Sequence, residues 1–184
     1  MKEKIFEPLT KKEGAGAEVR RIFPSTSLDH LDPFVLLDEF FVDADKGFPM
    51  HRHAGFEAVT YILEGSFRHK DDIGNDSVVG EGGVQKFTAG KGIKHSEMPV
   101  GEKGAHGFQL WVNLPKEKKE IEPNYQKVEA KKIPETKDGT TIIRTIIGEG
   151  SPVKIETPVV YQDVILEKGC FRSIDLLQNF QGLL

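Results

Sequence analysis

The fold is decided between residues 51 and 65, which read HRHAGFEAVTYILEG. Side chains alternate between two faces along a strand, so His51 and His53 share a face. Residues Phe56–Leu63 are rich in β-branched and aromatic side chains, which favour strands. Glu64-Gly65-Ser66 is predicted to be a turn, and Ser66–Lys70 to be the next strand. The segment therefore predicts two consecutive β-strands that follow a motif of paired histidines.

Glycine and proline divide the rest of the chain in the same way. The 184 residues include 19 glycines and 10 prolines, which fall every few residues instead of clustering. Such spacing is typical of many short strands joined by turns, and no window shows a long helical period. An all-β antiparallel barrel or sandwich is therefore expected. The further strands predicted are Val19–Phe23, Phe34–Phe41, Gly83–Thr88, Ile93–Met98, Gly107–Leu114, Thr140–Ile147 and Val159–Leu166.

Composition and charge exclude several classes of protein. With 25 Lys and Arg against 29 Asp and Glu, the formal net charge is −4, so direct nucleic-acid binding is not expected. No apolar run approaches the roughly 20 residues that cross a bilayer, and the charged N-terminus does not look like a signal peptide. We expect no membrane association and a cytoplasmic location, or a nuclear one in a eukaryotic cell. Cys170 is the single cysteine, so any metal must be held by nitrogen and oxygen.

Three regions are expected along the chain. Residues 1–120 contain most of the predicted strands and form the barrel. Residues 121–138 mix lysines with acidic side chains around Pro123 and Pro134, which is the composition of a solvated connector. Residues 139–184 supply two more strands, too few to close a second barrel. They must pack on the first domain, pair with another chain or stay loosely ordered.

Two pairs of polar residues indicate a metal site. His51-Arg52-His53 and His95-Ser96-Glu97 each place two donor groups on one face of a strand. If the two pairs meet, three imidazoles and a carboxylate surround one point. This donor set suits Fe(II), Mn(II), Ni(II) or Zn(II), and an octahedral ion keeps positions for water or substrate. The two segments together predict a metal centre inside the barrel.

Glu57 is an alternative carboxylate for this site. It shares the face of the paired histidines if the strand is unbroken, but a hydrogen bond to a ligand imidazole and an ion pair with a cation both remain open. His30 and His69 have no comparable neighbours and are expected at the surface. His106 opens a strand, where an ordinary structural role is favoured over a place in the pocket.

A longer series of motifs stands in a fixed order along the chain: His51–Glu57, Thr60-Tyr61, Leu63-Glu64-Gly65, Gln85, Thr88–Pro99, His106–Pro115, Glu122-Pro123 and Tyr125-Gln126. This series closely resembles the pirin family of cupins. The resemblance is dense from about residue 19 to 126, looser to about 169 and weak beyond. It implies two stacked cupin barrels, which are double-stranded β-helices of the jelly-roll type, with one iron in the N-terminal barrel.

The resemblance also implies which residues hold the iron. Carried over to this chain, the ligands are His51, His53, His95 and Glu97, with Fe(II) as the expected metal. Glu97 therefore ranks above Glu57, although spacing alone does not separate the two carboxylates. Glu97 is also the natural proton acceptor for the chemistry that the resemblance implies.

The chain departs from the family pattern in two respects. Arg52 and Ala54 stand where proline and arginine are common, and Lys86-Phe87 stands where Trp-Met is usual. The ligands are kept, and the pocket lining is expected to differ. Family members also continue well beyond this length, so residues 139–184 are interpreted as the start of an incomplete second cupin domain.

Two functions follow from the resemblance. The first is an iron-dependent dioxygenase of the quercetin 2,3-dioxygenase type, in which the metal binds the deprotonated 3-hydroxyl of a flavonol as a Lewis acid. The second is a non-enzymatic, iron-dependent redox sensor that binds transcription factors as a coregulator. The expected partner is thus a small aromatic substrate or another protein. Candidate apolar walls, which are more often core residues, are Phe48, Phe56, Phe87, Met98 and Phe108.

Overall fold

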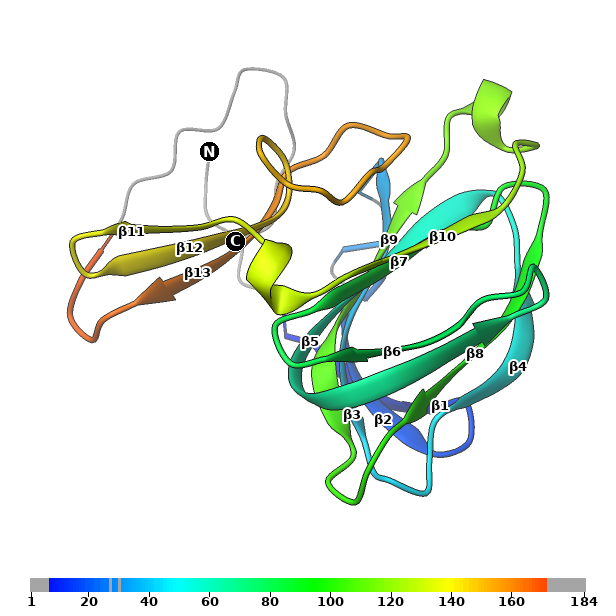
Figure 1. Ribbon diagram of the computed structural model, residues 1–184, viewed down its shortest axis with the longest axis horizontal. Coiled ribbons are helices and arrows are strands. Elements are labelled where there is room, and N and C mark those ends of the chain that lie inside the picture. Colours follow the sequence, from blue (N-terminus) through cyan, green and yellow to red (C-terminus); the bar gives the residue numbers. More distant parts are fainter. Residues whose placement is uncertain (1–6, 27, 30, 172–184) are drawn as a thin grey trace.

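Short antiparallel strands dominate the computed structural model, which describes residues 7–26, 28–29 and 31–171 (Figure 1). Helical structure in these residues is limited to the 3₁₀ turns η1 (Lys116–Lys118) and η2 (Ala130–Lys132), and no helix in this part could span a membrane. The all-β prediction is confirmed. The strands are β1 Leu9–Glu13, β2 Ala17–Phe23, β3 Phe34–Val42, β4 Phe48–His53, β5 Phe56–Asp71, β6 Asp76–Gly80, β7 Val84–Thr88, β8 Ile93–Pro99, β9 Ala105–Asn113, β10 Asn124–Val128, β11 Glu135–Asp138, β12 Thr141–Ile147 and β13 Tyr161–Leu166.

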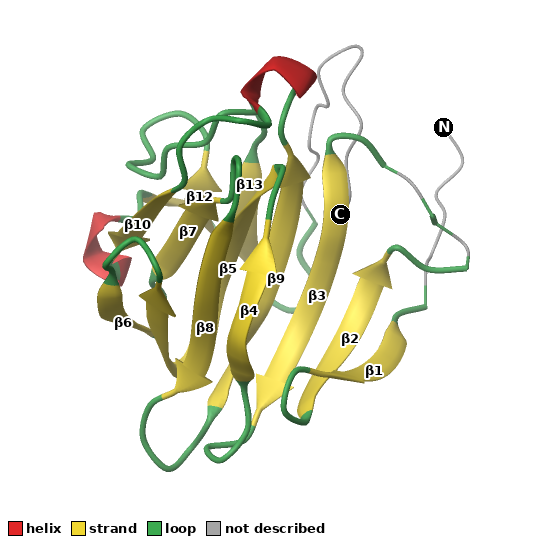
Figure 2. Ribbon diagram, turned by 90° about the vertical axis from the view of Figure 1, so that its right-hand side faces the viewer, coloured by secondary structure: helices red, strands yellow, loops and turns green. Residues whose placement is uncertain are grey.

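The main sheet curls into a barrel because one long strand belongs to both of its sides (Figure 2). One side follows the order β1-β2-β3-β9-β5-β7-β10, and the other is formed by β6, β8 and β4. Residues 56–65 of β5 pair with β9, whereas residues 66–71 pair with β6 and β8. Buried side chains such as Phe40, Ile62 and Phe67 pack together in an apolar cluster of the core.

Strand β5 runs through the predicted turn at Glu64-Gly65-Ser66, so that prediction is wrong. Gly65 explains the continuity, since it has a φ of 76° and a Cβ there would lie 2.1 Å from the Gly104 carbonyl oxygen. Only glycine allows this close approach. The pairing of β5 with β9 also shifts register between Ile62 and Glu64. This shift changes which alternate side chains of β5 face inward.

Part of the expected connector belongs to the barrel. Strand β10 pairs with β7, with Val128 opposite Val84, and so extends the main sheet. Val128 is buried and Tyr125 packs against the core, although the surrounding residues are mostly charged. The boundaries at residues 120 and 138 stay a prediction.

The remaining strands form a separate three-stranded sheet, β11-β12-β13, to the left of the barrel in Figure 1. An apolar cluster joins this sheet to the barrel through Tyr61 of β5, Ile146 of β12 and Val153 of the loop that follows β12. Of the three arrangements expected for residues 139–184, the described part packs on the first domain.

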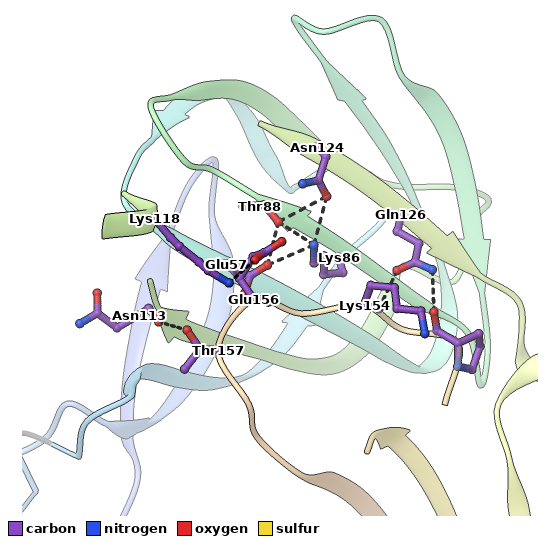
Figure 3. A network of polar contacts seen from close by, with 11 residues as sticks. Glu57, Lys86, Thr88, Asn113, Lys118, Asn124, Gln126, Lys154, Glu156 and Thr157 are labelled. Carbon is purple, nitrogen blue, oxygen red and sulfur yellow. Dashed lines mark hydrogen bonds and ion pairs between the residues drawn. The ribbon is translucent and has the colours of Figure 1, made fainter. Parts of the chain in front are cut away.

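A buried ion pair strengthens this junction (Figure 3). Lys86 Nζ lies 3.1 Å from Glu57 Oε1, and the two residues are only 3% and 0% exposed. Thr88 Oγ1 donates to Glu57 Oε1 at 2.7 Å, and the Glu156 backbone N–H donates to Glu57 Oε2 at 2.7 Å. Lys86 Nζ also donates to Asn124 Oδ1 at 3.1 Å. The pair therefore fastens the segment before β13 to strands β5, β7 and β10.

Candidate metal centre

Three neighbouring strands bring their polar pairs together inside the barrel. Strand β8 lies between β4 and β5, and the register sets His95 opposite His51 and Glu97 opposite His69. Members of a pair are two residues apart, so both face the same way. The pairs are His51 with His53 on β4, His95 with Glu97 on β8, and His69 with Asp71 on β5.

The structure brings the three predicted histidines together. One ring nitrogen from each of His51, His53 and His95 lies within 4.8 Å of the other two. The His51 Nδ1–H donates to the Pro49 carbonyl oxygen at 2.7 Å, which leaves Nε2 as the nitrogen with a free lone pair. Such a fixed tautomer is typical of imidazoles that bind metals.

Glu97 lies next to His95 but belongs to a second donor group. Its carboxylate, a ring nitrogen of His95 and a ring nitrogen of His69 lie within 4.8 Å of one another, and all three residues are buried. The two groups share His95. Five protein side chains therefore present donors to a single region of the barrel.

Neutral hydrogen-bond donors hold the Glu97 carboxylate in place. Thr60 Oγ1 donates to Oε1 at 3.1 Å, and Gln85 Nε2 donates to the same oxygen. Gln109 Nε2 donates to Oε2 at 2.7 Å. These three residues come from β5, β7 and β9, so the barrel itself orients the carboxylate. None of the three was predicted to belong to the site from the sequence.

Glu57 is directed away from the histidines, which answers the question left open by the sequence. Ala54 and Gly55 lie between the two strands, and Gly55 has a φ of 82°, so the alternation from β4 does not continue into β5. Glu57 instead forms the buried ion pair with Lys86. Its interpretation as the partner of a cation is confirmed.

The prediction that His69 lies at the surface is wrong, because this residue is 0% exposed. Its Nε2–H donates to Asp71 Oδ2 at 2.9 Å, and its ring stacks on Tyr125 with 4.1 Å between centroids. The spacing of His69-Lys70-Asp71 repeats that of the other two pairs. This repeat was the sequence feature that pointed to His69 as a residue of the site. His106 has ordinary structural contacts, with Nε2 2.9 Å from Glu39 Oε1. His30 lies outside the described residues.

Burial keeps two of the imidazoles neutral. Burial, reinforced by the nearby His51 and His69, lowers the pKa of His95 to about 3. Burial also lowers the pKa of His53 to about 3, again reinforced by its histidine neighbours. Burial opposes ionisation of Asp71, but hydrogen bonds from His69 and Asn75 outweigh it, and its pKa stays below the usual value. At neutral pH the cluster thus offers neutral imidazoles, the form that binds metals.

Unpartnered nitrogens show that this cluster fits a metal ion. Among the described residues, the buried side-chain atoms without a hydrogen-bond partner are His95 Nδ1, His95 Nε2 and His69 Nδ1. Leaving such an atom unsatisfied costs about 1–3 kcal/mol. All three atoms belong to histidines of the donor groups described above, and a bound cation would satisfy the lone pairs directed at it.

Aromatic rings form one wall beside the donors. The ring centroids of Phe56 and Phe87, both predicted as walls, lie 5.1 Å and 5.7 Å from the centroid of the His53 ring. Trp111 lies 4.9 Å from His53 and stacks on Phe56 at 4.3 Å. Phe48 packs against the apolar core instead.

Comparison with known proteins agrees with the geometry. The Pirin family model matches residues 16–112. A pirin-like protein from Arabidopsis thaliana is 47% identical over 165 residues, which make up 85% of this chain and 53% of that protein. Pirin from Homo sapiens is 46% identical over 169 residues, 89% of this chain and 58% of that protein. The chain therefore spans about half the length of the curated relatives it matches.

A solved structure supports the fold in the same way. The crystal structure of quercetin 2,3-dioxygenase from Acinetobacter baumannii has a TM-score of 0.81 and 27% sequence identity, covering 88% of this chain and 56% of that chain. This likeness confirms the cupin barrel. Because the matched family region covers more than half of the 184 residues and includes the whole histidine cluster, this chain belongs to the pirin family.

Proposed function

We propose that this chain binds Fe(II) and acts as a dioxygenase that opens flavonols, in the manner of quercetin 2,3-dioxygenases. The observation that supports this best is the group of three imidazole donors within 4.8 Å of one another, next to a buried carboxylate. The structural likeness to a quercetin 2,3-dioxygenase supports a flavonol as the substrate in this proposal.

The proposed ligands are His51, His53, His95 and Glu97. Nitrogen and oxygen donors of this kind suit Fe(II), and also Mn(II), Ni(II) or Zn(II). When bound, the metal supplies Lewis acidity and a coordination position for the flavonol 3-hydroxyl. The protein supplies neutral imidazoles, because burial lowers the pKa of both His53 and His95 to about 3.

The remaining chemistry is assigned to residues around this set. The stacked pair Phe56 and Trp111 presents flat aromatic surface on which a flavonol ring can pack. Glu97 accepts the proton of the 3-hydroxyl. Within the described residues, every hydrogen bond that Glu97 receives comes from a neutral amide or hydroxyl group, such as Gln109, so no cationic side chain of the protein competes with this proton.

The test uses this chain itself, loaded with Fe(II) without oxygen and then mixed with quercetin and O₂. The proposal predicts loss of the flavonol absorbance and release of carbon monoxide. Glu97→Gln should slow the reaction by about 10²–10⁴-fold, the usual contribution of a positioned acid–base group. Glu129→Gln, an exposed carboxylate beside Lys127, is the matched control and should keep the full rate. A fully iron-loaded protein that leaves quercetin unchanged would contradict the proposal.

A further inference from the structure

The second donor group contains a histidine that the proposed ligand set does not use. His69 lies directly opposite Glu97 in the ladder between β5 and β8 and is 0% exposed. One of its ring nitrogens lies within 4.8 Å of donor atoms of His95 and Glu97. Within the described part of the chain, its Nδ1 is buried with no hydrogen-bond partner.

Asp71 determines which nitrogen of His69 carries the proton. Backbone N–H groups of Ile73 and Asn75 donate to Asp71 Oδ1 at 3.2 Å and 2.8 Å, and Asn75 Nδ2 donates to Oδ2 at 2.8 Å. An acceptor surrounded in this way takes a further donor, which is the Nε2–H of His69 at 2.9 Å. Neutral His69 then has its lone pair on Nδ1. A carboxylate behind an imidazole in this way is the usual support of a metal-binding histidine.

The ring of His69 is also held against rotation. It stacks on Tyr125 with 4.1 Å between centroids and 14° between planes. The Tyr125 hydroxyl is in turn 2.7 Å from Ser77 Oγ. The unpartnered nitrogen is therefore fixed in direction before any ligand arrives.

We infer that His69 is a further metal ligand, coordinating through Nδ1 beside His95 and Glu97. This inference rests on the proposed metal centre and deepens it. Two donors at about 2.1 Å from one ion can be up to about 4.2 Å apart. Donors within 4.8 Å of one another therefore reach a common ion through small side-chain shifts. Because His95 belongs to both donor groups, an ion bound beside it is also within reach of His69 and Glu97.

Cobalt binding tests this inference without using activity. The full chain is titrated with Co(II), and both the affinity and the visible d–d spectrum are recorded for the wild type and for His69→Gln. The loss of a ligand should weaken binding at least tenfold and change the spectrum. His106→Gln is the matched control, since His106 also contacts a carboxylate but belongs to neither donor group. It should bind Co(II) within twofold of the wild type. Equal affinity and an unchanged spectrum for His69→Gln would overturn the inference.

A measurement on the wild type covers the case in which His69→Gln fails to fold. Two-bond ¹H–¹⁵N correlation spectra of the histidine rings are recorded with and without Zn(II). The His69 Nδ1 resonance should move while Nε2 stays protonated. If the rings of His51, His53 and His95 respond and His69 does not, the inference fails and the proposed function stands. If no histidine ring responds, the metal centre itself fails.

Discussion

Replacing Lys86 by methionine should destabilise the folded chain by about 3–5 kcal/mol, because it leaves a buried carboxylate without its cation. Glu57 is 0% exposed, and its Oε1 lies 3.1 Å from Lys86 Nζ. At an effective dielectric constant of about 20, that separation corresponds to about 5 kcal/mol of attraction. The hydrogen bonds from Thr88 and from the Glu156 backbone remain and reduce the loss.

Urea unfolding gives the free energy, and a thermal scan should show a melting temperature lower by about 6–20 °C for a chain of this size. Lys127→Met is the matched control, because Lys127 pairs with Glu129 on the surface, where an ion pair contributes at most about 1 kcal/mol. The double variant Glu57→Gln/Lys86→Met should recover much of the stability, since neither charge is then left alone. A Lys86→Met protein within about 1 kcal/mol of the wild type would refute the reasoning.

Three further predictions concern the pH dependence, the junction and the partner. The metal-free chain should lose stability as the pH falls from about 6.5 towards 3, because unfolded histidines take up protons there while folded His53 and His95, with pKa values of about 3, do not. The contribution of His95 to the free energy of unfolding should fall by up to about 1.4 kcal/mol per pH unit, as measured by urea unfolding. An equally steep loss of stability in His95→Gln would contradict this prediction. Tyr61→Phe, which loses a 2.9 Å hydrogen bond to Asp163, should cost about 1 kcal/mol and speed amide exchange in β13, whereas unchanged exchange would speak against that contact. If the chain is instead a coregulator, the proteins it captures should differ between its Fe(II) and Fe(III) forms, and identical sets would reject that hypothesis.

Local alternation was sufficient to predict the pairs that share a strand. His51 and His53 lie together on β4, and His95 and Glu97 on β8, because a period of two sets the shared face whatever the strand pairs with. The same rule failed for Glu57. Its outcome depends on Gly55, whose positive φ ends the alternation between the two strands.

The buried position of His69 could not be predicted from the sequence for a different reason. Whether its face of β5 points into the barrel depends on the register shift between Ile62 and Glu64, which arises from pairing with β9. It also depends on Gly65, which lets one strand pass from one side of the barrel to the other. Such features are properties of the packed sheet and not of a short window. Strand β10 was missed because its neighbouring residues are charged, although Val128 is buried.

The most direct test of the account is the metal content of the purified chain after equilibration with Fe(II) under anaerobic conditions. Wild-type protein and the control His106→Gln should each retain about one ion per chain. His51→Ala and Glu97→Ala should retain much less. Loss of a ligand, or of a residue that orients a ligand, weakens metal binding at least tenfold. Full metal retention in both alanine variants, or none in the wild type, would contradict the claim that these side chains converge on one ion.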